Sequence, residues 1–141
     1  MKENEYIEIL LKLSKKAYDK TEVPISALIV KNDKIISKAY NKKNIRNNPL
    51  MHAEIICLQK AYKKLNRWNL NDCKLYVSLE PCDMCKRIIE ESRIKEVYYV
   101  LKKGKTTNKY TKTKYEQLYT IRYSCFKELI NKFFNKLRNN L

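Results

Sequence analysis

Residues 75–85 carry the sequence LYVSLEPCDMC, in which a short apolar run leads into two cysteines. The run from Leu75 to Leu79 predicts a buried strand that ends before Glu80 and Pro81. Because proline is favoured at the start of a helix, residues 82–92 are predicted to be helical. A strand that leads directly into a helix is typical of layered α/β domains.

The alternation of strands and helices continues on both sides of this stretch. The sequence predicts a helix over residues 5–18, a hairpin of strands 23–30 and 35–40, a polar loop over 41–49, a helix over 51–65 and a strand over 97–101. These elements predict one α/β domain over residues 1–141 with a partly parallel sheet. No element is predicted for residues 102–118.

A C-terminal helix is predicted from apolar residues at helical spacing. These are Phe126, Leu129, Ile130, Phe133, Phe134 and Leu137. We interpret the stripe as core packing, with a surface for a partner as the alternative.

Length and composition exclude several classes of protein. The 141 residues suit one domain, and a hydrophobic content of 44% argues against wholesale disorder. No run approaches the roughly 18 apolar residues of a membrane span. The first residues lack the basic region and apolar run of a signal peptide. We therefore expect a cytoplasmic protein that does not enter a membrane.

The net charge is +16, from 31 basic and 15 acidic residues. Such a charge indicates a polyanionic partner, most often a nucleic acid. Enrichment of residues with AT-rich codons is the alternative source of the lysines. The lysines are unevenly placed, however, since residues 102–114 contain six of them and no acid.

The candidate metal ligands are His52, which is the only histidine, and the cysteines of the motif Pro81-Cys82-Asp83-Met84-Cys85. Three residues apart on a helix, the two thiols lie on one face at the N-terminus, where the helix dipole favours thiolate. Thiolates and imidazole are good Zn²⁺ ligands, and three of them leave a fourth position open for water, as in catalytic zinc sites. Glu54 can then exchange protons with that water without binding the metal.

The pair Cys82 and Cys85 is also compatible with two further roles. A lone Cys-x-x-Cys pair fits a redox protein, or half of a structural zinc site, although no second pair exists to complete one. The five cysteines are an odd number without a secretory signal, which argues against a disulfide framework.

The spacing of H-x-E and P-C-x-x-C is the signature of zinc-dependent nucleobase deaminases. Within that superfamily the chain resembles the bacterial tRNA adenosine deaminases of TadA type over most of its length. The resemblance is carried by residues 22–25, 27–30, 52–55, 75–82, 84–85 and 92–94, and by Asn41 and Pro49. Its most specific string is Leu79-Glu80-Pro81-Cys82.

The resemblance implies a three-layer α/β/α fold with a mixed sheet, one zinc ion per chain on His52, Cys82 and Cys85, and Glu54 as proton shuttle. It also implies deamination of adenosine to inosine at the wobble position of tRNA, a homodimer, and contact of Asn41 with the flipped base. A deaminase of a free base such as guanine or cytosine is the alternative enzyme. A catalytically silent RNA-binding subunit is the alternative from another class, against which the intact Glu54 argues.

The sequence departs from the family near the substrate. Ser26 stands where the family usually has glycine, and Lys86, Arg87 and Ile88 stand where it has small residues. A basic stretch replaces the family's usual pattern after the last predicted strand. In a layered α/β domain, the loops after the second and fourth strands can both reach the rim of the pocket. We expect Lys102, Lys103 and Lys105 to contact RNA phosphates there.

Overall fold

The computed structural model describes residues 2–104 and 112–140. Its elements are α1 (Lys2–Asp19), β1 (Ser26–Lys31), β2 (Lys34–Tyr40), α2 (Ala53–Leu65), β3 (Lys74–Leu79), α3 (Asp83–Glu91), β4 (Glu96–Leu101), β5 (Lys114–Gln117) and α4 (Tyr123–Asn139). The predicted helices, hairpin and strands are confirmed within a few residues. The strand expected over 23–30 begins only at Ser26, and β5 was not predicted.

The strands form one mixed sheet in the order β2-β1-β3-β4-β5. Strand β1 is antiparallel to β2 and β3, whereas β3, β4 and β5 are parallel. The expected mixed sheet is therefore confirmed. Because β3 and β4 are parallel and in register, the residues that follow Leu79 and Leu101 leave the sheet at the same edge.

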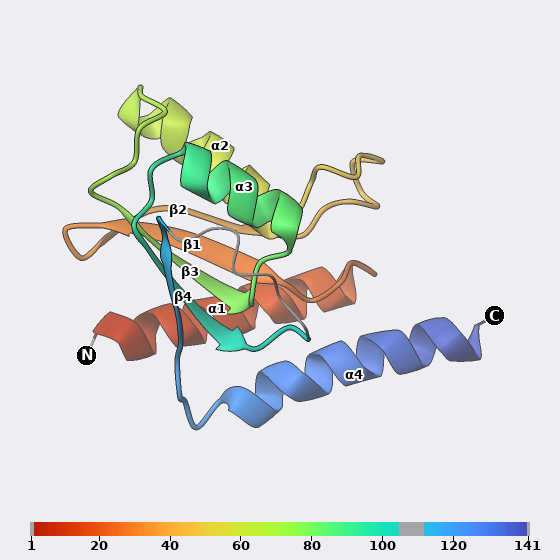
Figure 1. Cartoon of the computed structure of the whole chain (residues 1–141). Coiled ribbons are helices and arrows are strands. Elements are labelled where there is room, and N and C mark those ends of the chain that lie inside the picture. The colour runs from red at the N-terminus through yellow and green to blue at the C-terminus, as the bar shows by residue number, and fades with distance from the viewer. Residues whose placement is uncertain (1, 105–111, 141) are drawn as a thin grey trace.

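Helices cover both faces of the sheet, with α2 and α3 on one side and α1 and α4 on the other (Figure 1). Neighbouring residues of β1 serve opposite cores, since side chains alternate along a strand. Ala27 and Ile29 pack with α2 and α3, whereas Leu28 and Val30 pack with α1 and α4. The expected α/β/α layers are confirmed.

Helix α4 contributes less to the core than its apolar stripe suggests. Phe126 and Phe133 are buried, and Leu129 and Ile130 pack against the core while partly exposed. The last apolar positions, Phe134 and Leu137, are 43% and 51% exposed, so the interpretation of the stripe as core is wrong for them. Neither α4 nor any other helix in the described ranges has the length and hydropathy to span a bilayer.

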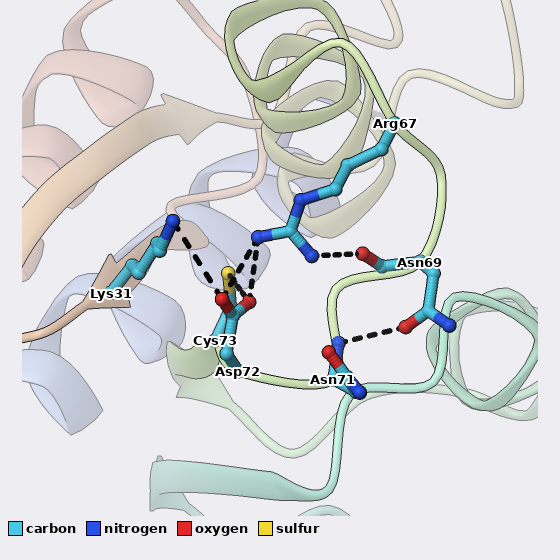
Figure 2. A network of polar contacts seen from close by, with 6 residues as sticks. All are labelled: Lys31, Arg67, Asn69, Asn71, Asp72 and Cys73. Atoms are coloured by element: carbon cyan, nitrogen blue, oxygen red, sulfur yellow. Dashed lines mark hydrogen bonds and ion pairs between the residues drawn. The ribbon is translucent and has the colours of Figure 1, made fainter.

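A polar network fixes the connection from α2 to β3 (Figure 2). One guanidinium nitrogen of Arg67 donates to both carboxylate oxygens of Asp72, at 2.8 and 3.0 Å, and Lys31 of β1 lies 3.7 Å from the same carboxylate. The bond from Arg67 lowers the pKa of Asp72. Arg67 also donates to the carbonyl of Asn69. The loop is thereby held to the end of β1, away from the carboxyl ends of β3 and β4.

Strands β2 and β5 are the outer strands of the described sheet. Strand β2 carries Lys34 and Lys38, and the ammonium of Lys60 on α2 donates to the backbone oxygen of Lys38 at 2.9 Å. Strand β5 has only four residues. Strand β2 is thus lined with lysines, and strand β5 is short.

Candidate active site

The three predicted metal ligands come together where α2 and α3 begin. His52 directly precedes α2, Cys82 directly precedes α3, and Cys85 lies in the first turn of α3. The Nδ1 atom of His52 lies 3.9 Å from Cys82 Sγ and 3.5 Å from Cys85 Sγ. His52 and Cys82 have the extended backbone of a helix N-cap but make no capping bond with their side chains. Both side chains therefore face the shared site.

This donor set fits zinc. The ring nitrogen and the two sulfur atoms all lie within 4.8 Å of one another. One imidazole with two thiols is a ligand combination of zinc enzymes that keep a coordination position for water. Among the residues that the structure describes, no other group of three histidine, cysteine or acidic side chains lies close enough together to hold an ion.

The cysteines differ in how readily they ionise. Hydrogen bonds from Cys85 and then from His52 lower the pKa of Cys82 to about 3, which favours its thiolate form. The hydrogen bond to Cys82 and burial raise the pKa of Cys85. Burial raises the pKa of Cys57 to about 12 and that of Cys73 to about 11, so these remain neutral thiols. Of these four cysteines, only Cys82 and Cys85 lie beside the His52 imidazole, so position and not the pKa marks this pair as the candidate metal ligands.

Glu54 lies in the first turn of α2 and lines the same cavity as His52 and Cys82. It is only 4% exposed. Burial raises the pKa of its carboxyl group, so this carboxylate accepts a proton more readily than an exposed glutamate does. It is not part of the ligand cluster, as its predicted role requires.

The cavity has a volume of about 150 Å³. Residues before β1, after β2, after β3 and after β4 all contribute to its wall. Besides His52, Glu54 and Cys82, the lining consists of Val23, Ile25, Asn41, Lys43, Ala53, Leu79, Glu80 and Lys103. The expectation that the loops after the second and fourth strands reach the rim is confirmed.

Asn41 belongs both to the cavity and to a turn. It lines the cavity and is 6% exposed, yet its side-chain oxygen accepts the backbone N–H of Lys43 at 3.1 Å. Through this bond Asn41 stabilises the turn, which is a structural role separate from recognition of a base. Since the turn uses the oxygen, the amide nitrogen is the group through which Asn41 could donate to a base.

The loop that carries Asn41 is held in place by Glu22, which is fully buried. Its carboxylate accepts the backbone N–H groups of Asn44 at 3.0 Å and Ile45 at 2.6 Å. A buried carboxylate that binds two backbone donors fixes a polar loop that has no strand or helix of its own.

The lysines predicted to contact RNA are placed unequally. Lys102 and Lys103 are exposed after β4, and of these Lys103 lines the cavity. Lys105 lies outside the described residues. Sequence reasoning missed Lys43 and Glu80 in the lining; Glu80 stands in the family-like string before Cys82, which was a signal that could have identified it.

Two residues that depart from the family pattern, Ser26 and Lys86, are buried in the protein. The hydroxyl of Ser26 donates to the carbonyl of Leu10 at 2.7 Å, and the Ser26 N–H donates to Ser78 Oγ at 3.0 Å. Lys86 is buried and pairs with Glu80. Neither residue projects into the cavity lining.

Proteins of similar sequence are deaminases, which agrees with a ligand group of His52, Cys82 and Cys85 beside a buried Glu54. Residues 1–138 match the family of MafB19-like deaminases. The chain is 36% identical to the tRNA-specific adenosine deaminase of Aquifex aeolicus, over 96% of this chain and 96% of the relative.

Solved structures share the fold. A tRNA:A34 deaminase, studied for A-to-I editing at the wobble position, superposes with a TM-score of 0.76 at 26% identity, covering 84% of this chain and 100% of the other. A guanine deaminase from Bacillus subtilis superposes with a TM-score of 0.63 at 30% identity, covering 88% and 93%.

Proposed function

Because this chain belongs to the deaminase family, as a MafB19-like deaminase related to the tRNA-specific adenosine deaminases, we propose that it converts adenosine to inosine at the wobble position of tRNA. The observation that carries the proposal is the buried Glu54, which lines one cavity together with His52 and Cys82, next to the ligand group that Cys85 completes. The tRNA substrate also suits a cytoplasmic enzyme.

We propose zinc as the metal, one ion per chain, held by His52, Cys82 and Cys85. The ion would supply a water molecule activated for attack on C6 of adenine. The donor set and the lowered pKa of Cys82 support this assignment.

Glu54 moves the protons of the reaction. Deamination adds the elements of water to C6 and releases ammonia, so a proton must leave the water and a proton must reach the leaving amine. A carboxyl group whose pKa is raised by burial can accept the first water proton and deliver it to N1 of the ring. It can then take the second proton from the C6 hydroxyl and deliver it to the amine, which leaves as ammonia. An anticodon loop already presents unpaired bases, so bringing one into the cavity costs little.

The charges around the cavity favour RNA. Burial and then four neighbouring cations lower the pKa of Lys42, and these cations are Lys60, Arg46, Lys16 and Lys20. None of these five residues takes part in the ion pairs formed within residues 2–104 and 112–140. These cations gather around Lys42, which lies in the chain between Asn41 and Lys43 of the cavity lining, and such a concentration of positive charge attracts a phosphate backbone.

A guanine deaminase is the second candidate, since one such enzyme is 30% identical and shares the fold. A free base has no phosphate for the basic surface to bind. Purified protein should be incubated with tRNA, and the tRNA sequenced for adenosines that are read as G. Turnover of an anticodon stem-loop without turnover of guanine supports our proposal, and the reverse result refutes it.

Substitution of the lysines after β4 is expected to impair RNA binding, whereas substitution of Asn41 is expected to impair turnover. Replacing Lys102, Lys103 and Lys105 together should weaken RNA binding and flatten its dependence on salt, by a log–log slope of about 0.7 per lost contact. Turnover of bound RNA should change little. Asn41→Ala should leave binding nearly intact and reduce turnover strongly, because it removes the proposed contact to the flipped base. It also removes the bond to the Lys43 N–H.

Asn41→Asp is the matched control, because it keeps the oxygen that accepts the Lys43 N–H and loses the amide donor. An active Asn41→Asp enzyme would show that the residue serves only the turn. Unchanged affinity and salt slope in the triple lysine variant would show that RNA binds elsewhere.

We also propose that the enzyme is a homodimer, and that α3 contributes to the contact. Met84 and Ile88 are one turn apart on α3 and each is 37% exposed. Lys86, which replaces a small residue of the family, points inward and leaves this face free.

Light scattering is expected to give the mass of two chains, and Ile88→Arg should shift it toward one, because a buried charge at an interface is costly. Leu137→Arg on the exposed face of α4 is the control and should leave the mass unchanged. A wild-type monomer that is fully active at assay concentration would contradict the proposal.

A further inference from the structure

A lysine and a glutamate are buried together beside the cavity. Lys86 is 4% exposed and Glu80 is 5% exposed, and Lys86 Nζ lies 3.1 Å from Glu80 Oε2. Lys86 follows Cys85 on α3, whereas Glu80 follows β3 and lines the cavity. Each charge requires the other, because a buried charge without a partner is strongly destabilising.

The pair is connected to the chain that leaves β4. The second carboxylate oxygen of Glu80 accepts the backbone N–H of Lys103 at 3.3 Å, and the Glu80 N–H donates to the carbonyl of Leu101 at 2.8 Å. On the other side, Lys86 Nζ lies 4.8 Å from the ring centroid of Tyr115 on β5, within the range of a cation–π contact.

We propose that Glu80 and Lys86 are positioning residues that hold Lys103, and with it one wall of the cavity, in the place where RNA binds. Lys86 orients the Glu80 carboxylate, and the carboxylate fixes the backbone of Lys103. The expected effect on RNA binding rests on the proposed function, whereas the expected effect on the backbone of Lys103 does not.

A role in positioning differs from a role in stability. Replacing both members of a buried ion pair by apolar residues is often neutral for stability, so the fold alone does not require the pair. The bond to Lys103 N–H, in contrast, has no substitute in an apolar variant. Loss of the pair should therefore affect RNA binding more than proton transfer, since Glu54 lies on α2, in a different segment of the cavity wall from Lys103. Zinc content must be measured as well, because Glu80 and Lys86 are close in sequence to Cys82 and Cys85.

The test uses three variants of the full chain. Lys86→Met removes one charge. Glu80→Met with Lys86→Met removes both, and keeps the test valid if the single variant does not fold. Arg87→Met is the matched control, because Arg87 is the next residue on α3 and also pairs with a glutamate, Glu91, but on the surface.

Amide hydrogen exchange of Lys103, zinc content, and KM and kcat on an anticodon stem-loop are then measured. We expect a protected Lys103 amide in the wild type. In the double variant we expect faster exchange and a KM raised about tenfold, as for the loss of one hydrogen bond, with zinc and kcat nearly unchanged. Arg87→Met should behave as the wild type.

An unprotected Lys103 amide in the wild type overturns the inference without any variant. So does a double variant with unchanged exchange, or one that loses kcat at constant KM. A wild-type enzyme that does not act on the stem-loop refutes the proposed function instead, and leaves the exchange measurement as the test of the link to Lys103.

Discussion

The Glu54→Ala enzyme is expected to bind one zinc ion per chain and to have lost nearly all turnover. The carboxylate is proposed to move protons in two steps, and general acid–base assistance is typically worth about 10²–10⁴-fold in rate. Glu54 lies outside the ligand group, so its removal leaves the three metal donors in place. Metal analysis and single-turnover kinetics on an anticodon stem-loop measure the two effects separately.

Glu91→Ala is a suitable control, since Glu91 is an exposed carboxylate on α3 that pairs with Arg87. It should retain both zinc and activity. Full activity of Glu54→Ala at normal zinc content would end the proposed role, and loss of zinc from that variant would make Glu54 a ligand.

Zinc itself is expected to disappear when any one ligand is removed. His52→Ala, Cys82→Ala and Cys85→Ala should each lose the metal and all measurable activity, because the described residues supply no further donor at this site. Zinc per chain, measured after dialysis, is the primary readout.

The remaining cysteines provide controls within the same chain. Cys57 is fully buried and its thiol lies 3.1 Å from Ser37 Oγ, while Cys73 and Cys125 belong to other parts of the fold. Cys57→Ser, Cys73→Ser and Cys125→Ser should keep the metal. If one of them loses zinc while Cys82→Ala or Cys85→Ala retains it, the ligand assignment is wrong.

The sequence predicted most of the fold because its signals are local. The apolar run 75–79, the Pro81 that precedes α3 and the turn at Asn32 and Asp33 each act within a few residues. The metal cluster was also predictable, since Cys82 and Cys85 share one helical turn and His52 is the only histidine.

What the sequence could not provide depends on contacts between distant segments. Strand β5 is short, half-exposed and rich in charged residues, and it becomes a strand because β4 offers it a parallel edge. The burial of Lys86 runs against the usual placement of lysines on the surface. It follows from the carboxylate of Glu80, six residues away in sequence and placed there by β3.

The two outer strands, β2 and β5, have features that oppose aggregation through the edges of the sheet. An exposed strand edge is a template on which another chain can add a strand, and lysines and short strands prevent this. On β2 the edge carries Lys34 and Lys38, and the Lys60 ammonium occupies a backbone oxygen that a foreign strand would need. The lysines on and beside β2 therefore oppose extension of the sheet by another chain at this edge.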